Sequence, residues 1–195
     1  MPFNVNQFRQ QMTGDGARPN LFEVKMVVPP WAKPGAYDVA RKISFFANAA
    51  SLPGSTLGVA PAFYFGREAK FAGNRTYQDW TITVMNDEDF AVRTAFERWH
   101  TGINDPVLNV RSQYAPTVDS GYGVDAEVWQ YGKQGGANPV KSYKFYGMFP
   151  IDISPIELAW NANDTIEEFQ VTFAYQYWVA GDSASASSAI PRGLI

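Results

Sequence analysis

Apolar and polar side chains alternate along several short stretches of the chain, and glycine, proline or asparagine residues separate these stretches. A two-residue period is typical of β-strands that bury one face. It predicts strands at 21–28, 39–47, 62–71, 76–85, 124–131, 142–149 and 167–179. This pattern predicts a mainly β protein whose antiparallel sheets pack as a β-sandwich or close like a barrel.

One segment changes from the two-residue period to a helical period. Its apolar residues recur at the spacing of a single helix face, at Val92, Ala95, Phe96 and Trp99. Asn86 or Asp87 can cap the first turn of this helix. The pattern predicts one flanking α-helix, at about Asp87–His100, that covers an edge or an open end of the sheets.

Three consecutive carboxylates, Asp87, Glu88 and Asp89, lie where the strand gives way to this helix. An exposed carboxylate at the positive end of a helix contributes about 0.3–1 kcal/mol. The first interpretation of the three acids is therefore a helix cap and not a catalytic site.

The remaining segments are rich in turn residues. Three prolines at 29–34 predict a loop that could present Trp31 at the surface, and 102–123 and 132–139 also predict loops. The length of 195 residues predicts one domain over 1–180, and the Ser- and Ala-rich segment 181–195 predicts a flexible tail.

Composition excludes several kinds of chemistry. The chain has no cysteine, which excludes disulfides, thiolate zinc sites and cysteine nucleophiles. Packing or charge complementarity at the helix end explains the single histidine, His100. The sequence therefore predicts no catalytic, cofactor-binding or metal site, and a protein that is not an enzyme.

Charge and hydropathy narrow the possible partners. The formal net charge is -3, so tight binding to nucleic acid by phosphate neutralisation is not expected. No run approaches the roughly 20 apolar residues that span a bilayer, and the N-terminus does not resemble a signal peptide, which predicts a cytoplasmic chain at synthesis. Only 18% of residues are charged, which fits either a surface covered by partners or a core-rich β protein.

Aromatic content leaves one alternative function open. Six tryptophans and ten tyrosines could line the binding face of a carbohydrate-binding β-sandwich. Most of them fall on the apolar phase of a strand or helix, which favours the core. Trp31 and Trp129 are the exceptions.

Four segments resemble a known family in the same order along the chain. They are "GARPNLFEV" (16–24), "AASLPG" (49–54), "FAGNRTYQDWTITVMNDED" (71–89) and "EEFQVTFAYQYW" (167–178). Each looks like the corresponding segment of the tail tube proteins of contractile-tailed bacteriophages. The third is the most specific, and "ARPNLF" is also distinctive.

The resemblance implies a structural virion protein, assembled in the host cytoplasm and located in the phage tail. Such proteins form hexameric rings, and the rings stack on a baseplate into a tube inside a contractile sheath. The lumen holds the tape-measure protein and later conducts the genome without sequence-specific binding of DNA. A tube initiator, a tube terminator and a secretion-system tube protein are related alternatives.

The resemblance also implies two sets of contact residues. Contacts between subunits or rings are expected at Leu52, Pro53, Gly54, Phe63, Tyr64 and Phe65, within a loop that reaches a neighbour. Contacts with the sheath are expected at Asp87, Glu88 and Asp89. The resemblance assigns no role to the segments 29–42 and 102–123 or to the tail, which could face outward.

Overall fold

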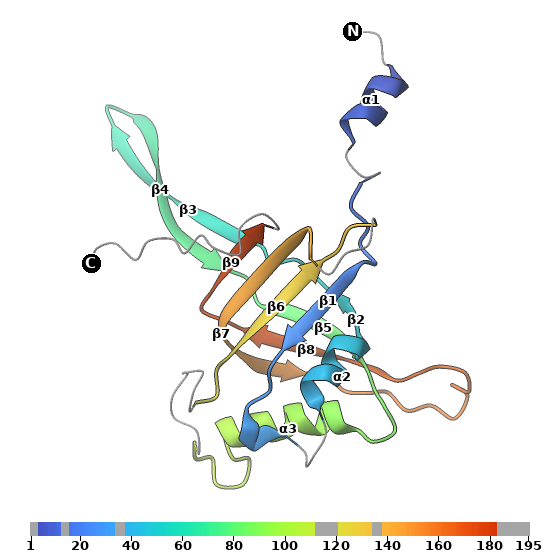
Figure 1. Cartoon of the computed structure of the whole chain (residues 1–195). Coiled ribbons are helices and arrows are strands. Elements are labelled where there is room, and N and C mark those ends of the chain that lie inside the picture. The colour runs from blue at the N-terminus through green and yellow to red at the C-terminus, as the bar shows by residue number, and fades with distance from the viewer. Residues whose placement is uncertain (1–3, 13–15, 34–37, 112–120, 134–137, 183–195) are drawn as a thin grey trace.

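Figure 1 shows the computed structural model, which describes residues 4–12, 16–33, 38–111, 121–133 and 138–182. Its helices are α1 (Val5–Gln11), the 3-10 turn η2 (Pro30–Ala32), α2 (Val39–Phe46) and α3 (Ala91–Ile103). Its strands are β1 (Phe22–Met26), β2 (Ala47–Ala50), β3 (Ser55–Tyr64), β4 (Arg67–Tyr77), β5 (Trp80–Met85), β6 (Val124–Gln130), β7 (Lys141–Ile153), β8 (Glu168–Ala174) and β9 (Tyr177–Asp182). The mainly β fold class is confirmed.

All strand pairs are antiparallel, as the sequence predicts. Among the described residues, the main sheet runs in the order β1-β6-β7-β8-β5-β2, β9 pairs with β7 outside this order, and β3 pairs only with β4. The long strand β7 belongs to two layers of the sheet. Residues 141–146 pair with β9, whereas residues 149–153 pair with β8.

Gly147 lies between the two halves of β7. Its φ of 61° falls in the left-handed region, which glycine adopts without steric penalty. The Gly147 N–H donates to Asp125 Oδ1 on β6 at 3.3 Å instead of continuing a regular ladder. The strand therefore leaves one layer and enters the other at this residue, and the two layers enclose a single core.

The core lies between the inner faces of these layers. Alternate residues of β5, namely Trp80, Ile82 and Val84, are buried, which confirms the predicted face of that strand. Helix α3 covers one end of the sheets (Figure 1). Its predicted apolar face is also buried, and the ring of Phe96 contacts Phe173 with a centroid distance of 5.8 Å.

Helix α3 begins later than the sequence predicts. The Phe90 N–H donates to the Asp87 carbonyl at 2.8 Å, so residues 87–90 form a turn before the first helical residue, Ala91. Phe90 at the N-cap has a positive φ, and its side chain makes no capping bond. The helix extends to Ile103, three residues beyond the predicted end.

The predicted strand at 39–47 is wrong, because residues 39–46 form helix α2. The Asp38 side chain accepts a hydrogen bond from the Arg41 N–H at 3.2 Å and so caps the helix. Val39 and Ile43 lie one helical turn apart and are both buried. Two further helices, α1 and α2, therefore accompany the one flanking helix that the sequence predicts.

Three other predicted strands are interrupted. The predicted strand 76–85 is divided at residues 78–79, because its first two residues belong to β4 and β5 begins at Trp80. A two-residue turn, Phe65–Gly66, divides the predicted strand 62–71 between β3 and β4. Both turn residues have positive φ, as a type I′ hairpin turn requires. The predicted strand 167–179 divides at residues 175–176, because the Gln176 N–H donates to the Tyr146 carbonyl and β9 then pairs with the other half of β7.

Trp31 and Trp129, the two tryptophans that could have supported a carbohydrate-binding function, both make contacts within the chain. Trp31 is half-buried against the core, so its predicted presentation at the surface is wrong. The Trp129 indole donates to Glu127 Oε2 at 2.7 Å, and Lys25 Nζ lies 3.3 Å from its ring centroid. Lys25 therefore covers one face of the Trp129 ring, and Trp31 is packed against the core, which does not favour stacking of either ring on a sugar.

The described part of the chain contains no helix that is both long and apolar enough to cross a bilayer. Much of the predicted loop 102–123, four residues of the loop 132–139 and residues 183–195 of the predicted tail lie outside the described residues. The division into one domain at 1–180 and a tail at 181–195 stays a prediction.

Candidate assembly surfaces

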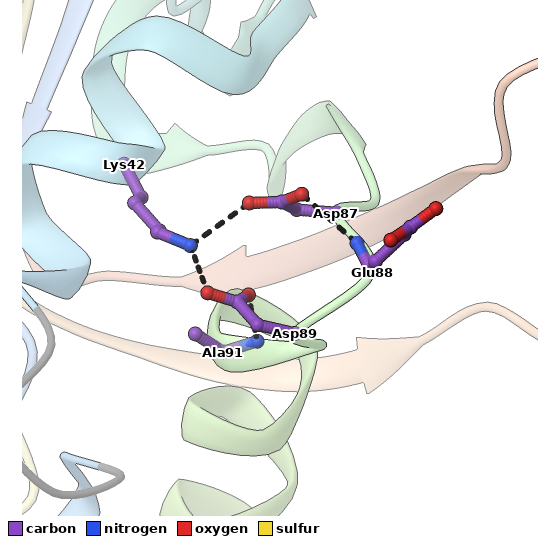
Figure 2. Close-up of polar contacts among 5 residues, drawn as sticks. All are labelled: Lys42, Asp87, Glu88, Asp89 and Ala91. Carbon is purple, nitrogen blue, oxygen red and sulfur yellow. Dashed lines mark hydrogen bonds and ion pairs between the residues drawn. The ribbon is translucent and has the colours of Figure 1, made fainter.

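The three acids before α3 form a turn that faces a lysine of another helix. Lys42 of α2 pairs with Asp87 at 2.9 Å between Nζ and Oδ2, and also with Asp89 (Figure 2). Lys42 lies 45 residues before Asp87 in the chain. The two aspartates therefore join α2 to the start of α3.

The second carboxylate oxygen of each aspartate accepts a hydrogen bond from a backbone N–H group. Asp87 Oδ1 accepts from the Glu88 N–H at 2.9 Å, and Asp89 Oδ1 accepts from the Ala91 N–H at 2.9 Å. The Ala91 N–H is one of the first amides of α3, which have no partner within the helix. Asp89, and not the predicted Asn86 or Asp87, therefore caps α3.

The geometry also sets the charge state of the pair. The hydrogen bond from Lys42 lowers the pKa of Asp89, and the Ala91 N–H lowers it further. The hydrogen bonds to Asp89 and Asp87 raise the pKa of Lys42. Both shifts favour the ionised forms, so the Lys42–Asp89 pair is charged at neutral pH.

Glu88 differs from its two neighbours. Figure 2 shows its side chain directed away from Lys42 and into the space beside the turn. The structure therefore separates the three sheath-facing candidates, because the exposed Asp87 and Asp89 pair with Lys42 whereas the Glu88 side chain is directed away from it.

The predicted neighbour-contacting loop is a long hairpin. Strands β3 and β4 project from the body of the molecule as a two-stranded ribbon (Figure 1). Every residue of β3 is exposed, including the apolar side chains of Leu57, Val59 and Phe63. Phe65 at the tip is 91% exposed. Apolar side chains exposed along a whole ribbon indicate a surface that binds another protein.

The six predicted contact residues fall at the two ends of this hairpin. Leu52, Pro53 and Gly54 lie at its base, where two core-side indoles hold the backbone: Trp80 donates to the Ser51 carbonyl and Trp178 donates to the Gly54 carbonyl. Phe63, Tyr64 and Phe65 lie at its tip. The ten residues of β3 separate the two groups by about 30 Å at the usual rise of a strand.

A third surface was missed from the sequence. Residues 154–168, which we call the acidic arm, connect β7 to β8 and include the first residue of β8. The arm curves around a cavity of about 790 Å³, and its side chains Leu158, Trp160 and Ile166 are exposed. The apolar residues in "IELAWNANDTIEE" were the available signal, because they fit neither a strand nor a helix period.

The described residues contain no cluster of three or more histidine, cysteine, aspartate or glutamate side chains placed to hold a metal ion. Burial lowers the pKa of His100, although the Pro150 backbone and the charge of Asp152 act in the opposite direction. His100 therefore has the environment of a packed side chain near the end of α3.

We predict that Asp89→Asn lowers the melting temperature at pH 7. The amide can still accept from the Ala91 N–H, but the ion pair with Lys42 is lost. The pKa of Asp89 is lower in the folded state, so the charge stabilises the fold above about pH 4, the unfolded pKa, and this stability is lost as pH falls through the folded pKa. Thermal unfolding from pH 7 to pH 2 should show the two proteins converging.

The matched control for this experiment is Glu88→Gln, which removes a neighbouring charge that does not face Lys42. Its melting temperature should follow the wild type at every pH. Equal melting temperatures for wild type and Asp89→Asn at pH 7 would contradict a stabilising role for the Lys42 pair.

Comparisons with known proteins agree with the resemblance. The phage tail tube protein family matches residues 17–181. Tail tube protein gp19 of Enterobacteria phage T4 is 30% identical over 166 residues, which are 85% of this chain and 93% of the relative, and gp19 of Enterobacteria phage T6 matches equally.

Solved structures share the fold. A chain of the anti-feeding prophage baseplate has a TM-score of 0.59 at 14% identity, covering 86% of this chain and 97% of that one. A chain of the extended PVC sheath–tube complex, an extracellular contractile injection system, has a TM-score of 0.58 at 11% identity, covering 92% and 99%. With the family match across most of its length, the chain belongs to the phage tail tube protein family.

Proposed function

We propose that this chain forms the inner tube of a contractile phage tail, as hexameric rings that stack into a conduit. The family match over residues 17–181 carries this conclusion. The chain is a structural protein of the virion tail. Its exposed hairpin supports assembly, because apolar surface displayed in this way is stabilised when a second copy covers it.

The proposed partners follow from the place of such a tube. A sheath protein surrounds it, a baseplate begins it, and the tape-measure protein and then the genome occupy its lumen. The role in assembly requires no catalysis.

The outward face of β5 and β8 suits the wall of that lumen. Thr81 and Thr172 face each other across the two strands with 3.1 Å between their hydroxyl oxygens, and Thr83 is paired with Gln170. Neither strand contains a lysine or arginine. A wall without cations offers DNA phosphates no counterions, so the genome can slide without being retained.

The opposite layer has a different outward face. Lys25 of β1 and Lys144 of β7 are set among carboxylates there, with Lys144 Nζ 3.5 Å from Asp125 Oδ2. We therefore place β5 and β8 on the lumen side and the β1-β6-β7 layer away from it.

Glu88 is the candidate contact for the sheath. It stands in the turn before α3, and its side chain is directed away from the protein's own Lys42 (Figure 2). A basic group of a sheath protein could pair with it without disturbing the junction of α2 and α3. Asp87 and Asp89 would then act indirectly, by holding the turn in place.

Purified protein should form rings and tubes, which negative-stain microscopy and sedimentation can detect. Leu52→Asp should weaken this association about tenfold or more, because an unsatisfied polar group buried at a contact costs about 1–3 kcal/mol. Leu52→Met keeps the apolar surface and should assemble normally. A wild-type protein that stays monomeric at high concentration, even on a baseplate template, would refute the proposed function.

The absence of cysteine allows the lumen face to be located directly. Gln170→Cys places one thiol on the outward face of β8, and Val179→Cys places one on β9 in the opposite layer. After assembled tubes are labelled with a small gold maleimide, cryo-EM should show the Gln170 label at the inner radius and the Val179 label farther out. The reverse order would exclude the proposed lumen face.

Glu88→Lys should weaken sheath attachment and leave tube formation unchanged, since the charge at the proposed contact is reversed outside the Lys42 pair. Co-assembly of tube and sheath proteins followed by sedimentation measures both steps. Glu88→Gln should give an intermediate effect. Normal sheath attachment by the lysine variant would leave Glu88 without this role.

A further inference from the structure

We propose that the β3–β4 hairpin of one copy docks on the acidic arm of a neighbouring copy, so that these two surfaces form the contact that propagates the assembly. The inference rests on the proposed function, since it names the two surfaces that meet when the tube forms. Three independent features of the described residues support it: the charges, the apolar side chains and the positions of the two surfaces.

The charges of the two surfaces are opposite. The hairpin, residues 55–77, contains the basic residues Arg67, Lys70 and Arg75 and a single acidic residue, Glu68, for a net charge of +2. The acidic arm, residues 154–168, contains four acidic residues and no basic one, for a net charge of -4. Complementary charges of this kind steer two surfaces together and fix their orientation.

Two of the four acidic side chains in the arm accept hydrogen bonds from other residues of the same chain. Glu167 accepts from the Asn86 side chain at 3.0 Å, and Glu168 accepts from Asn48 at 2.6 Å. These contacts hold the C-terminal part of the arm against the body. The exposed Glu157 and Asp164, which lie farther along the arm, are therefore the candidates for pairing with the hairpin.

The apolar side chains of both surfaces are unusually exposed. The hairpin tip presents Phe63, Tyr64 and Phe65, and the last two rings make an edge contact with 4.6 Å between centroids. The arm presents the fully exposed indole of Trp160 together with Leu158, beside the cavity of about 790 Å³. Aromatic side chains seated in such hollows supply most of the affinity in protein interfaces.

The positions of the two surfaces exclude a contact within one chain. Strand β5 pairs with β8 so that Trp80 is opposite Phe173 and Met85 is opposite Glu168. The hairpin joins β5 at the Trp80 end, and the arm joins β8 at the Glu168 end. The two surfaces thus leave opposite ends of the same paired strands and project to opposite sides of the molecule (Figure 1).

A contact between unlike surfaces of two identical chains is heterologous, and repetition of such a contact closes a ring or extends a stack. Opposite placement on the molecule leaves each copy with one hairpin to donate and one arm to receive. This is the geometry that a tube requires.

Reciprocal charge reversal tests the proposed pair of surfaces. Lys70→Glu should weaken assembly about tenfold, and Glu157→Lys should do the same. Combining the two in one chain should restore assembly toward the wild-type level, because each altered surface again meets its complement. Lys133→Glu changes the net charge equally at an exposed position outside both surfaces and should assemble normally.

A cross-linking experiment locates the contact without altering the aromatic residues. One protein carries Ala69→Cys in the hairpin, and another carries Asn161→Cys beside Trp160. A short bis-maleimide should give cross-linked dimers between the two proteins in mixed tubes, and much less product with either protein alone.

The outcomes separate this inference from the proposed function. If wild-type tubes form but the double reversal does not assemble and no mixed dimer appears, the hairpin–arm contact is wrong and the tube function stands. If the wild type forms neither rings nor tubes, both are wrong.

Discussion

The bend of β7 at Gly147 is the constraint on which the rest of the fold depends. One half of this strand pairs with β6 and β9, and the other half pairs with β8, so a single chain segment joins the two layers around the core. A side chain at this position would strain the positive φ that allows the turn. Since the layers are fixed in this way, α3 can cover one end with its apolar face.

The same constraint places the assembly surfaces. Strand β8 pairs with the second half of β7, and β5 pairs with β8. Strand β5 joins the hairpin at one end of this pair, and β8 joins the acidic arm at the other end. None of the fully buried core residues lies in either surface, and the arm adds only the partly buried Ile156 to the packing around the core. The protein therefore separates the residues that stabilise the subunit from those available for contacts with other subunits, and changes at the hairpin tip can alter assembly while the core stays intact.

The alternation of apolar and polar residues predicted the elements that bury one face, but it did not predict the other elements. Trp80, Ile82 and Val84 were predictable because polar residues stand between them, and the apolar face of α3 was predictable for the same reason. Helix α2 buries only Val39 and Ile43, too few residues to distinguish a helix from a strand. The hairpin buries neither face, so only residues 62–71 of it were predicted as a strand, and that prediction missed the turn at Phe65–Gly66. Apolar and polar side chains continue to alternate along residues 169–175, up to the break before β9, so the alternation did not reveal that break.

The candidate sites show a similar limit. The family motif located the acids before α3, but local sequence could not show that Lys42, 45 residues away, engages Asp87 and Asp89 and leaves Glu88 outside. The tertiary contact changes their chemistry, since two of three apparent surface charges are paired internally. The arm was missed because a segment without secondary structure produces no periodic pattern, although its composition was visible.

The charged residues are distributed unevenly along the chain, which the net charge alone does not show. The whole chain carries -3, the hairpin +2 and the acidic arm -4, so the rest of the molecule carries only -1. Almost all of the charge imbalance is therefore confined to two surfaces at opposite ends of the same strands. Two such molecules attract each other hairpin to arm and repel each other hairpin to hairpin or arm to arm. The same charges that keep exposed aromatic surfaces from associating at random therefore favour the single head-to-tail orientation in which a tube can grow.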